Sequence, residues 1–183
     1  IQALVATKSL NQQIVDAAEK MLECFKRGGK ILICGNGGSA ADAQHLSSEL
    51  LNRYCDERRE LPGIALAADG STISSIANDY DFSLIFSKQI NALAREDDLV
   101  FLITTSGNSA NILNAYEAAH SKGAAAIVLN GKNGGKLTKV LKSNGINDIE
   151  IRVPAETTAR VQEVHGLVIH CLCELIDHQL DSF

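Results

Sequence analysis

The sequence predicts an α/β fold of three layers, in which helices cover both faces of a five-stranded parallel sheet. Five short apolar runs of strand length alternate with helical patterns along the chain. Glycine-rich turns join several strands to the helices that follow, as in parallel α/β proteins. Since no linker, internal repeat or low-complexity segment interrupts the sequence, we expect residues 1–183 to form a single domain.

The expected strands differ in how many of their faces are buried. They are ILIC (31–34), GIALAA (63–68), LVFLIT (99–104), AAAIVLN (124–130) and DIEIRV (148–153). The first four are nearly continuous apolar runs, which is typical of strands buried on both faces. In the fifth, apolar residues alternate with Glu150 and Arg152, so we expect an edge strand.

Apolar positions recur at helical spacing before and between these strands. From Ile14 to Phe25 they form one stripe that stops at Gly28 and Gly29, which predicts a helix ahead of the first strand. The further expected helices are 36–54, 71–95 with a break near Asn78, 109–122 and 157–180.

Composition excludes several classes of protein. The 17 Lys and Arg against 22 Asp and Glu give a net charge of −5, and aromatics are only 4%, which argues against a nucleic-acid-binding surface. No apolar run approaches the roughly 18 residues of a membrane span, and the first residues lack the pattern of a signal peptide. We therefore expect a cytoplasmic protein that binds neither nucleic acid nor membrane.

Cysteine usage supports a reducing compartment. The five cysteines are Cys24, Cys34, Cys55, Cys171 and Cys173. Their number is odd and they lack CxxC spacing, so neither a disulfide framework nor a four-thiolate zinc site is expected.

The turn after the first strand, GNGGS, is a candidate anion site. Gly35, Gly37 and Gly38 permit a tight or left-handed backbone, while Asn36 and Ser39 offer polar side chains. Ser39 is also a candidate cap of the helix that follows. An ordinary glycine-rich turn without a ligand is the competing interpretation.

The sequence does not fit either of two nucleotide-binding motifs that its glycines suggest. The spacing of Gly35, Gly37 and Ala40 fits a loose dinucleotide fingerprint, but Asp69 lies too far beyond it to be the acidic partner. A P-loop also fails, because Gly135 and Lys136 are followed by Leu rather than Ser or Thr.

The turn after the third strand, TTSGNS, favours a phosphate. Thr104, Thr105, Ser106 and Ser109 place four hydroxyls around Gly107 at the start of a helix. Hydroxyls and free helix amides together suit an anion. Ordinary helix capping is the alternative.

Two helices carry candidate metal or proton-transfer residues. His45 and Glu49 are one turn apart on one face, although such pairs are also common on exposed helices. In the last helix, Glu163 is nearly eclipsed with His170, whereas Gln162 diverges from it by about 80°. Periodicity alone does not choose between Glu163 and Gln162, and core or interface histidines remain the ordinary interpretation.

Five ordered strings resemble the phosphoheptose isomerases of the sugar isomerase (SIS) domain superfamily. They are CGNGGSAADAQHLSSEL, IANDYDF, TTSGNSANI, NGKNGGK and RVQEVHGLVIH. The resemblance covers nearly the whole chain, from about Lys20 to Leu180. It implies a flavodoxin-like five-stranded sheet, a homotetramer with active sites near subunit boundaries, and interconversion of sedoheptulose 7-phosphate and D-glycero-D-manno-heptose 7-phosphate, which opens the path to lipopolysaccharide heptose.

The resemblance also implies a zinc cofactor and a set of site residues. The implied zinc ligands are His45, Glu49, Gln162 and His170. The implied sugar-phosphate contacts are Asn36, Gly37, Gly38, Asn78, Asp79, Thr104, Thr105, Ser106 and Ser109, with Gln162 also at the substrate. The chain departs from the family pattern at two positions. Thr104 stands where serine is commoner. Ala159 stands where some members carry aspartate, so no proton-transfer role is assigned to position 159.

Aldose–ketose exchange needs a base that moves a proton between two carbons and stabilisation of the developing oxyanion. Glu49 is the candidate base and His170 the acid or second base, with their division of labour beside zinc left open. The alternative is a noncatalytic adaptor of the same superfamily that binds a replication initiator. As the resemblance implies, that adaptor lacks this Glu and His, whereas this chain has both.

Overall fold

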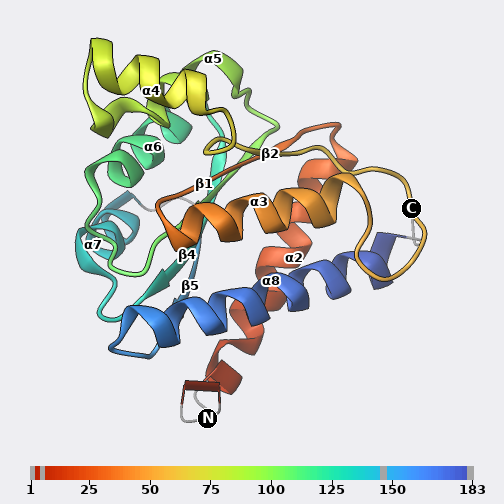
Figure 1. The fold of residues 1–183 in the computed structure, drawn as a ribbon. Helices are drawn as coiled ribbons and strands as arrows, with labels where there is room; N and C mark the ends of the chain where they lie inside the picture. Colours follow the sequence, from red (N-terminus) through yellow and green to blue (C-terminus); the bar gives the residue numbers. More distant parts are fainter. Residues whose placement is uncertain (1–2, 5–6, 145–147, 181–183) are drawn as a thin grey trace.

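A parallel sheet lies between two layers of helices in the computed structural model, which describes residues 3–4, 7–144 and 148–180 (Figure 1). The strands are β1 (Ile31–Gly35), β2 (Gly63–Ala65), β3 (Leu99–Ile103), β4 (Ala125–Gly131) and β5 (Ile149–Val153). Their order is β2-β1-β3-β4-β5, and every neighbouring pair is parallel. The predicted fold class, and the flavodoxin-like strand order that the resemblance implied, are confirmed.

Alternate strand residues contribute to two separate cores, one under each helical layer. Ile31 and Ile33 pack with one layer, whereas Leu32 and Cys34 pack with the other. The first layer consists of α2 (Asn11–Lys26), α3 (Gly38–Leu51) and α8 (Thr158–Leu180). The second consists of α4 (Gly70–Asp79), α5 (Ser87–Leu93), α6 (Ala110–Ser121) and α7 (Gly135–Asn144). Two short 3₁₀ helices are η1 (Thr7–Leu10) and η2 (Phe82–Leu84).

The expectation that the second strand is buried on both faces is wrong. β2 has only three residues and forms one edge of the sheet, with Ile64 40% exposed. The N–H of Leu66 makes a last bond to the Ile33 carbonyl of β1, and the chain then turns out of the sheet, where the N–H of Ala68 bonds to the carbonyl of Ala65. The predicted edge position of β5 is confirmed.

The long helical pattern after β2 is divided into three parts, as the break near Asn78 predicted. Asp69 caps α4 by accepting the backbone N–H groups of Ser71 and Thr72, and α4 ends at Asp79. Asp81 then starts η2 by accepting the N–H of Ser83. Sequence analysis did not predict α7. Among the described residues, no helix combines the length and apolar character needed to cross a bilayer.

The strand order places a crevice between β1 and β3. From β1 the chain moves outward to β2, and from β3 it moves the opposite way to β4 and β5. The connections that leave the carboxyl ends of β1 and β3 therefore diverge, one toward α3 and the other toward α6. Ligands of open α/β sheets bind at such a reversal.

Candidate active site

A polar cavity of about 270 Å³ lies beyond the carboxyl ends of β1 and β3. Its lining residues are Asn36, Gly38, Ser39, Ile103, Thr104, Thr105, Ser106, Ser109, Thr158 and Gln162. Most of the residues that the resemblance implied as sugar-phosphate contacts therefore lie together. Thr158 and Gln162 reach the cavity from α8, so three helices meet around it.

Glycines allow the chain to approach closely at the first turn. Gly37 has a φ of +56°, in the left-handed region that favours glycine. A Cβ on Gly38 would lie 2.3 Å from Nε2 of Gln162, so a larger residue there would displace that amide. The expectation that Ser39 caps α3 is wrong, because the N-cap is Gly37 and Ser39 is buried within the first turn. The amino end of α3 thus borders the cavity, which favours an anion.

The Thr104 side chain shapes the second turn from within. It is 4% exposed, and its hydroxyl accepts the backbone N–H groups of Ser106 at 3.4 Å and Gly107 at 3.2 Å. Gly107 has a φ of +63°, and a Cβ there would lie 2.0 Å from the carbonyl oxygen of Gly134. Threonine keeps the hydroxyl needed for these bonds, so its presence in place of serine preserves the turn.

Asn111 is a site residue that sequence analysis missed. Its amide and that of Asn36 form two reciprocal hydrogen bonds of 2.8 and 2.9 Å, and Asn111 is 2% exposed. The pair joins the β1 turn to the first turn of α6 and fixes the orientation of the Asn36 amide at the cavity wall. The polar residue two positions after Ser109 was the available signal, but its partner is distant in sequence.

Asn78 and Asp79 lie outside the cavity described above. They are exposed at the end of α4, where the Asn78 amide donates to the Asp79 carboxylate at 2.9 Å. A second hollow adjoins the cavity and shares Asn36 and Ser109 with it. Its lining residues are Asn36, Asp81, Phe82, Ser83, Ser109, Ala110 and Asn111.

A histidine cluster lies between α3 and α8, further along both helices from the cavity. Nε2 of His45 is 3.2 Å from Oε1 of Glu49 and 3.3 Å from Nε2 of His170. The rings of His45 and His170 meet edge to face, with centroids 5.0 Å apart. The ring of Tyr54 stacks on that of His170, with centroids 5.5 Å apart. Sequence analysis did not single out Tyr54, which follows α3 and lies far from His170 in the chain.

The spacing of the cluster suits zinc. Tetrahedral zinc holds nitrogen and oxygen ligands at roughly 2.0–2.1 Å, which places neighbouring ligand atoms roughly 3.3 Å apart. Both distances that involve His45 match this spacing. Within the described ranges, no group of three or more His, Cys, Asp or Glu side chains is arranged as a ready metal site. The cluster is therefore two ligand pairs that share His45, and not a preformed cage.

Gln162 lies apart from the pairs around His45. It faces Gly38, at the first turn of α3, whereas His45 is two helical turns further on, or roughly 10 Å along the axis. The structure thus places three of the four implied zinc ligands in two pairs that share His45, and the fourth at the cavity.

Asp42 lies between these two positions on α3. Burial raises the pKa of its carboxyl, and its Oδ2 is buried without a hydrogen-bond partner among the described residues.

The buried His165 links α8 to the sheet. Its Nε2 lies 3.0 Å from the carbonyl oxygen of Asn130, while Nδ1 is buried without a partner. Burial lowers the pKa of His165 to about 4. The ring is therefore neutral at pH 7, and Nε2 donates to the Asn130 carbonyl.

His165 should make stability depend on pH. Its unfolded pKa is near 6.5 and its folded pKa is about 4, so the unfolded state binds the proton more readily. The contribution of His165 to the free energy of unfolding is therefore at its full value above pH 6.5. As the pH falls to 5, the free energy of unfolding should decrease by roughly 2 kcal/mol. Denaturant unfolding at fixed protein concentration, compared with His165→Gln, measures this. Equal pH dependence of the two proteins would contradict it.

Comparisons with known proteins converge on one family. The SIS domain family model matches residues 2–131. The phosphoheptose isomerase of Shewanella halifaxensis is 55% identical over 175 residues, which cover 96% of this chain and 87% of the relative. The solved phosphoheptose isomerase of Francisella tularensis superposes with a TM-score of 0.93 and is 47% identical in sequence. The one of Neisseria gonorrhoeae superposes with a TM-score of 0.90 and is 45% identical. In both structural comparisons, 97% of this chain and 92% of the other are covered.

Proposed function

The chain belongs to the SIS domain family and, within it, to the phosphoheptose isomerases, and we propose how its site interconverts sedoheptulose 7-phosphate and D-glycero-D-manno-heptose 7-phosphate. The proposal rests on the separation of two groups of residues along α3. The hydroxyl-rich cavity lies at the amino end of this helix, and His45 lies seven residues further along it, a rise of roughly 10 Å. The phosphate on C7 and the reacting carbons C1 and C2 are likewise at opposite ends of the substrate.

The cavity would hold the phosphate. Ser106 and Ser109 present hydroxyls at the start of α6, and the amino end of α3 adds its partial positive charge. Asn36, held by Asn111, would contact a sugar hydroxyl, and Gln162 would do so from α8. Asn78 and Asp79 are proposed as contacts that a bound substrate reaches from the adjoining hollow.

Ser106→Ala and Ser109→Ala should each weaken binding of sedoheptulose 7-phosphate about tenfold, because each removes a hydrogen bond to a charged acceptor. Calorimetry on the purified variants measures this. Ser121→Ala, at the far end of α6, is the matched control, since its hydroxyl donates only to the Ala118 carbonyl. Equal affinity for the unphosphorylated heptulose would contradict the phosphate assignment.

Proton transfer is assigned to Glu49 and His170. From ketose to aldose, the Glu49 carboxylate takes a proton from C1 and returns one to C2. His170 gives a proton to O2 and takes one from O1, so the enediol forms and collapses without net proton change. Nε2 of His45 lies within 3.3 Å of both side chains, so the proposed base and acid are near each other.

Zinc would be held by His45, Glu49 and His170, with Gln162 as the implied fourth ligand. Support comes from the imidazole and carboxylate donor set and from the two distances around His45. When bound, the ion would polarise the substrate oxygens and stabilise negative charge on them.

Conversion of sedoheptulose 7-phosphate to heptose 7-phosphate by the purified protein tests the function. Product should form with zinc supplied, and its absence would contradict the assignment. No feature of the described residues favours the adaptor alternative, whereas Glu49 and His170 are both present and meet through His45.

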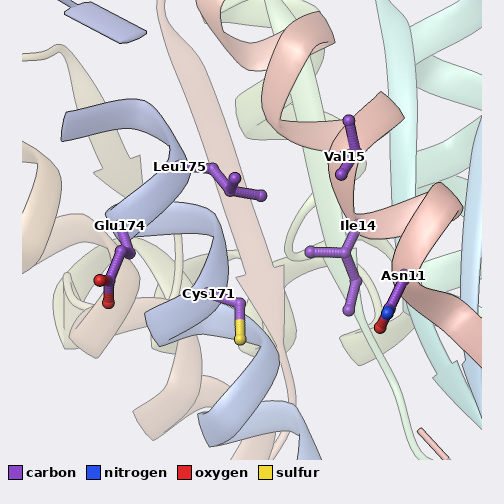
Figure 2. A pocket seen from close by; sticks show the side chains of 6 residues that line it. All are labelled: Asn11, Ile14, Val15, Cys171, Glu174 and Leu175. Atoms are coloured by element: carbon purple, nitrogen blue, oxygen red, sulfur yellow. The ribbon is translucent and has the colours of Figure 1, made fainter. Parts of the chain in front are cut away.

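The homotetramer remains a proposal, supported by uncovered apolar surface. Where α2 passes α8, Ile14, Val15 and Leu175 line an open cleft together with Asn11, Cys171 and Glu174 (Figure 2). Such a surface is typical of a subunit contact. Light scattering should give the mass of four chains, and a monomer at micromolar concentration would contradict the proposal.

A cytoplasmic location is likewise proposed. All five cysteines are free thiols, and Cys24, Cys34 and Cys173 are buried, where the pKa of each is raised by burial. Thiols that remain unpaired suit a reducing compartment. Cell fractionation would locate the protein.

A further inference from the structure

We propose that Arg58 and Asp177 form a positioning pair that holds α3 against α8 and so sets the distance between Glu49 and His170. Neither residue belongs to the cavity or to the histidine cluster. The inference rests on the proton-transfer roles proposed for Glu49 and His170, because positioning matters to catalysis only if those two side chains act together.

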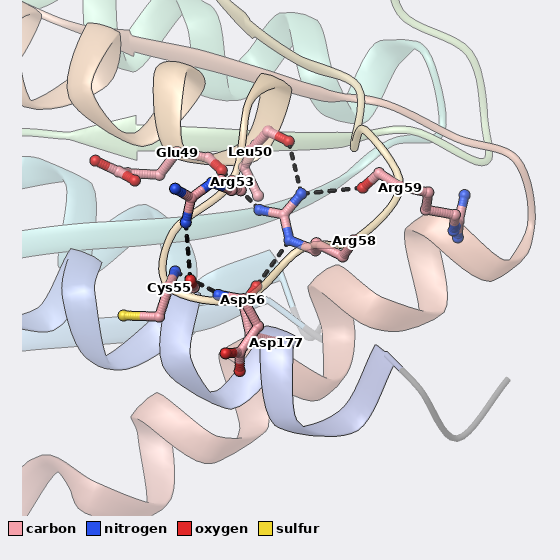
Figure 3. Close-up of polar contacts among 8 residues, drawn as sticks. All are labelled: Glu49, Leu50, Arg53, Cys55, Asp56, Arg58, Arg59 and Asp177. Carbon is pink, nitrogen blue, oxygen red and sulfur yellow. Dashed lines mark hydrogen bonds and ion pairs between the residues drawn. The ribbon is translucent and has the colours of Figure 1, made fainter.

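Arg58 is a buried cation in the loop that follows α3. Its side chain is 3% exposed, and every part of its guanidinium is used (Figure 3). Nη2 donates to the backbone carbonyl of Glu49 at 2.6 Å, and Nη1 donates to the carbonyls of Leu50 at 3.0 Å and Arg59 at 3.1 Å. Nε donates to Oδ1 of Asp177 at 2.7 Å. One planar group thus binds the last turn of α3 and the side of α8.

Asp177 ties the same loop from the other helix. Its side chain is also 3% exposed, and its Oδ2 accepts the backbone N–H groups of Cys55 at 3.2 Å and Asp56 at 3.5 Å. The carboxylate therefore holds the loop at two places, through its backbone and through the Arg58 side chain (Figure 3). Residues 52–62 form a clasp between the two helices.

The clasp is connected to the reacting groups on both helices. Glu49, whose carbonyl Arg58 binds, carries the proposed base, and His170 lies two turns before Asp177 on nearly the same face of α8. Tyr54, adjacent to Cys55 in the clasp, stacks on the His170 ring. A shift of the clasp would therefore move Glu49, His170 and the ring that packs on His170.

The chemistry of the pair favours positioning over stability. A buried ion pair contributes little net stability, since desolvation offsets most of the attraction. An arginine fork fixes direction as well as charge, because its planar donors reach several acceptors in set geometry, and lysine cannot reproduce this. Carbonyls in the last turn of a helix lack helical partners, and the guanidinium binds that of Glu49 and shares that of Leu50 with the Leu61 N–H.

The test compares Arg58→Lys and Asp177→Asn with a matched pair elsewhere. Asp98 is also a 3% exposed carboxylate that bonds one cation, Lys30 at 2.5 Å, and two backbone N–H groups, those of Lys30 and Arg95. It lies at the amino ends of β1 and β3, opposite the site. Asp98→Asn should lower the melting temperature about as much as Asp177→Asn, so it controls for loss of stability.

For Arg58→Lys and Asp177→Asn we expect kcat to fall between about tenfold and a hundredfold, as small misplacements of reacting groups do. KM should stay near wild type, because the clasp does not bind the cavity. Zinc affinity, measured on the folded proteins by competition with a chelator, should weaken by about tenfold or more. Asp98→Asn should change none of the three.

Wild-type kcat and zinc affinity in Arg58→Lys would overturn the proposal, and so would losses that Asp98→Asn shows equally. Failure of Arg58→Lys to fold, seen by circular dichroism, would also overturn it, since the pair would then be a folding requirement. The proposed function fails separately, if the wild-type protein supplied with zinc forms no heptose 7-phosphate, and the proton-transfer role of Glu49 fails if Glu49→Gln retains full turnover.

Discussion

Glu49→Gln should lower kcat by about 10² to 10⁴, the range typical of losing a general base. The Glu49 side chain is 21% exposed, and its Oε1 faces His45, so the nearly isosteric amide fits the same space. Glutamine cannot accept the proton from C1. Substrate binding should survive better than turnover, because Glu49 lies about three helical turns, or roughly 16 Å along the axis of α3, from the end of the helix that borders the phosphate cavity. Product formation from sedoheptulose 7-phosphate is the measurement.

Glu96→Gln is the matched control for this change. Glu96 is an exposed carboxylate just before β3, at the amino ends of the strands and so opposite the site. The same chemical substitution there should leave kcat unchanged. Wild-type turnover in Glu49→Gln would remove the carboxylate from the proton-transfer step.

Zinc content separates the two roles proposed for Glu49. A variant that keeps zinc but loses turnover identifies the carboxylate as the base. A variant that loses zinc, and regains turnover when zinc is supplied, identifies it as a ligand. In deuterium oxide, label entering the product at C2 would report the carbon proton transfer, although direct return of the proton can hide it.

The architecture could be predicted because its signals are local. β1, β3 and β4 are continuous apolar runs, and they occupy the three interior positions of the sheet. The alternation around Glu150 likewise identified β5 as an edge. β2 misled because its apolar run continues to residue 68, whereas the last bond to β1 is that from the Leu66 N–H to the Ile33 carbonyl, and the backbone then turns away. An apolar run in the sequence does not show at which residue a strand stops pairing with its neighbour.

The turns of the site were predictable, but the contacts between them were not. Glycines and hydroxyls mark the ends of β1 and β3 directly in the sequence. The bond between Asn36 and Asn111 joins residues 75 positions apart, and that between Arg58 and Asp177 joins residues 119 apart. An asparagine or arginine alone looks like a surface residue, and only the folded chain shows that it is buried and paired.

The spacing of residues within α8 does not identify the side chain that contacts His170. Periodicity left Glu163 and Gln162 as alternative companions of His170, and the structure separates these residues by location. Glu163 is exposed and pairs with Arg160, whereas Gln162 reaches the cavity beside Gly38. The contact that His170 does make, with His45, crosses between helices and cannot be read from the spacing of either one.

His45→Ala should reduce the zinc content of the protein from about one ion per chain to nearly none. His45 is the residue common to both ligand pairs, so its removal leaves Glu49 and His170 without the side chain that joins them. Metal analysis of protein purified without added zinc is the measurement. His178→Ala is the control, because His178 is 69% exposed on α8 and pairs with Glu174 at 3.7 Å, away from the cluster.

Chelation of the wild-type protein should abolish turnover while leaving the helical circular dichroism nearly unchanged. α3 and α8 are held by their own apolar contacts with the sheet and by the pair Arg58 and Asp177, so the metal is not needed to bring them together. This differs from small zinc domains, in which binding supplies the folding free energy. Unfolding on chelation would make the metal structural, and full turnover in metal-free protein would leave proton transfer to Glu49 and His170 alone.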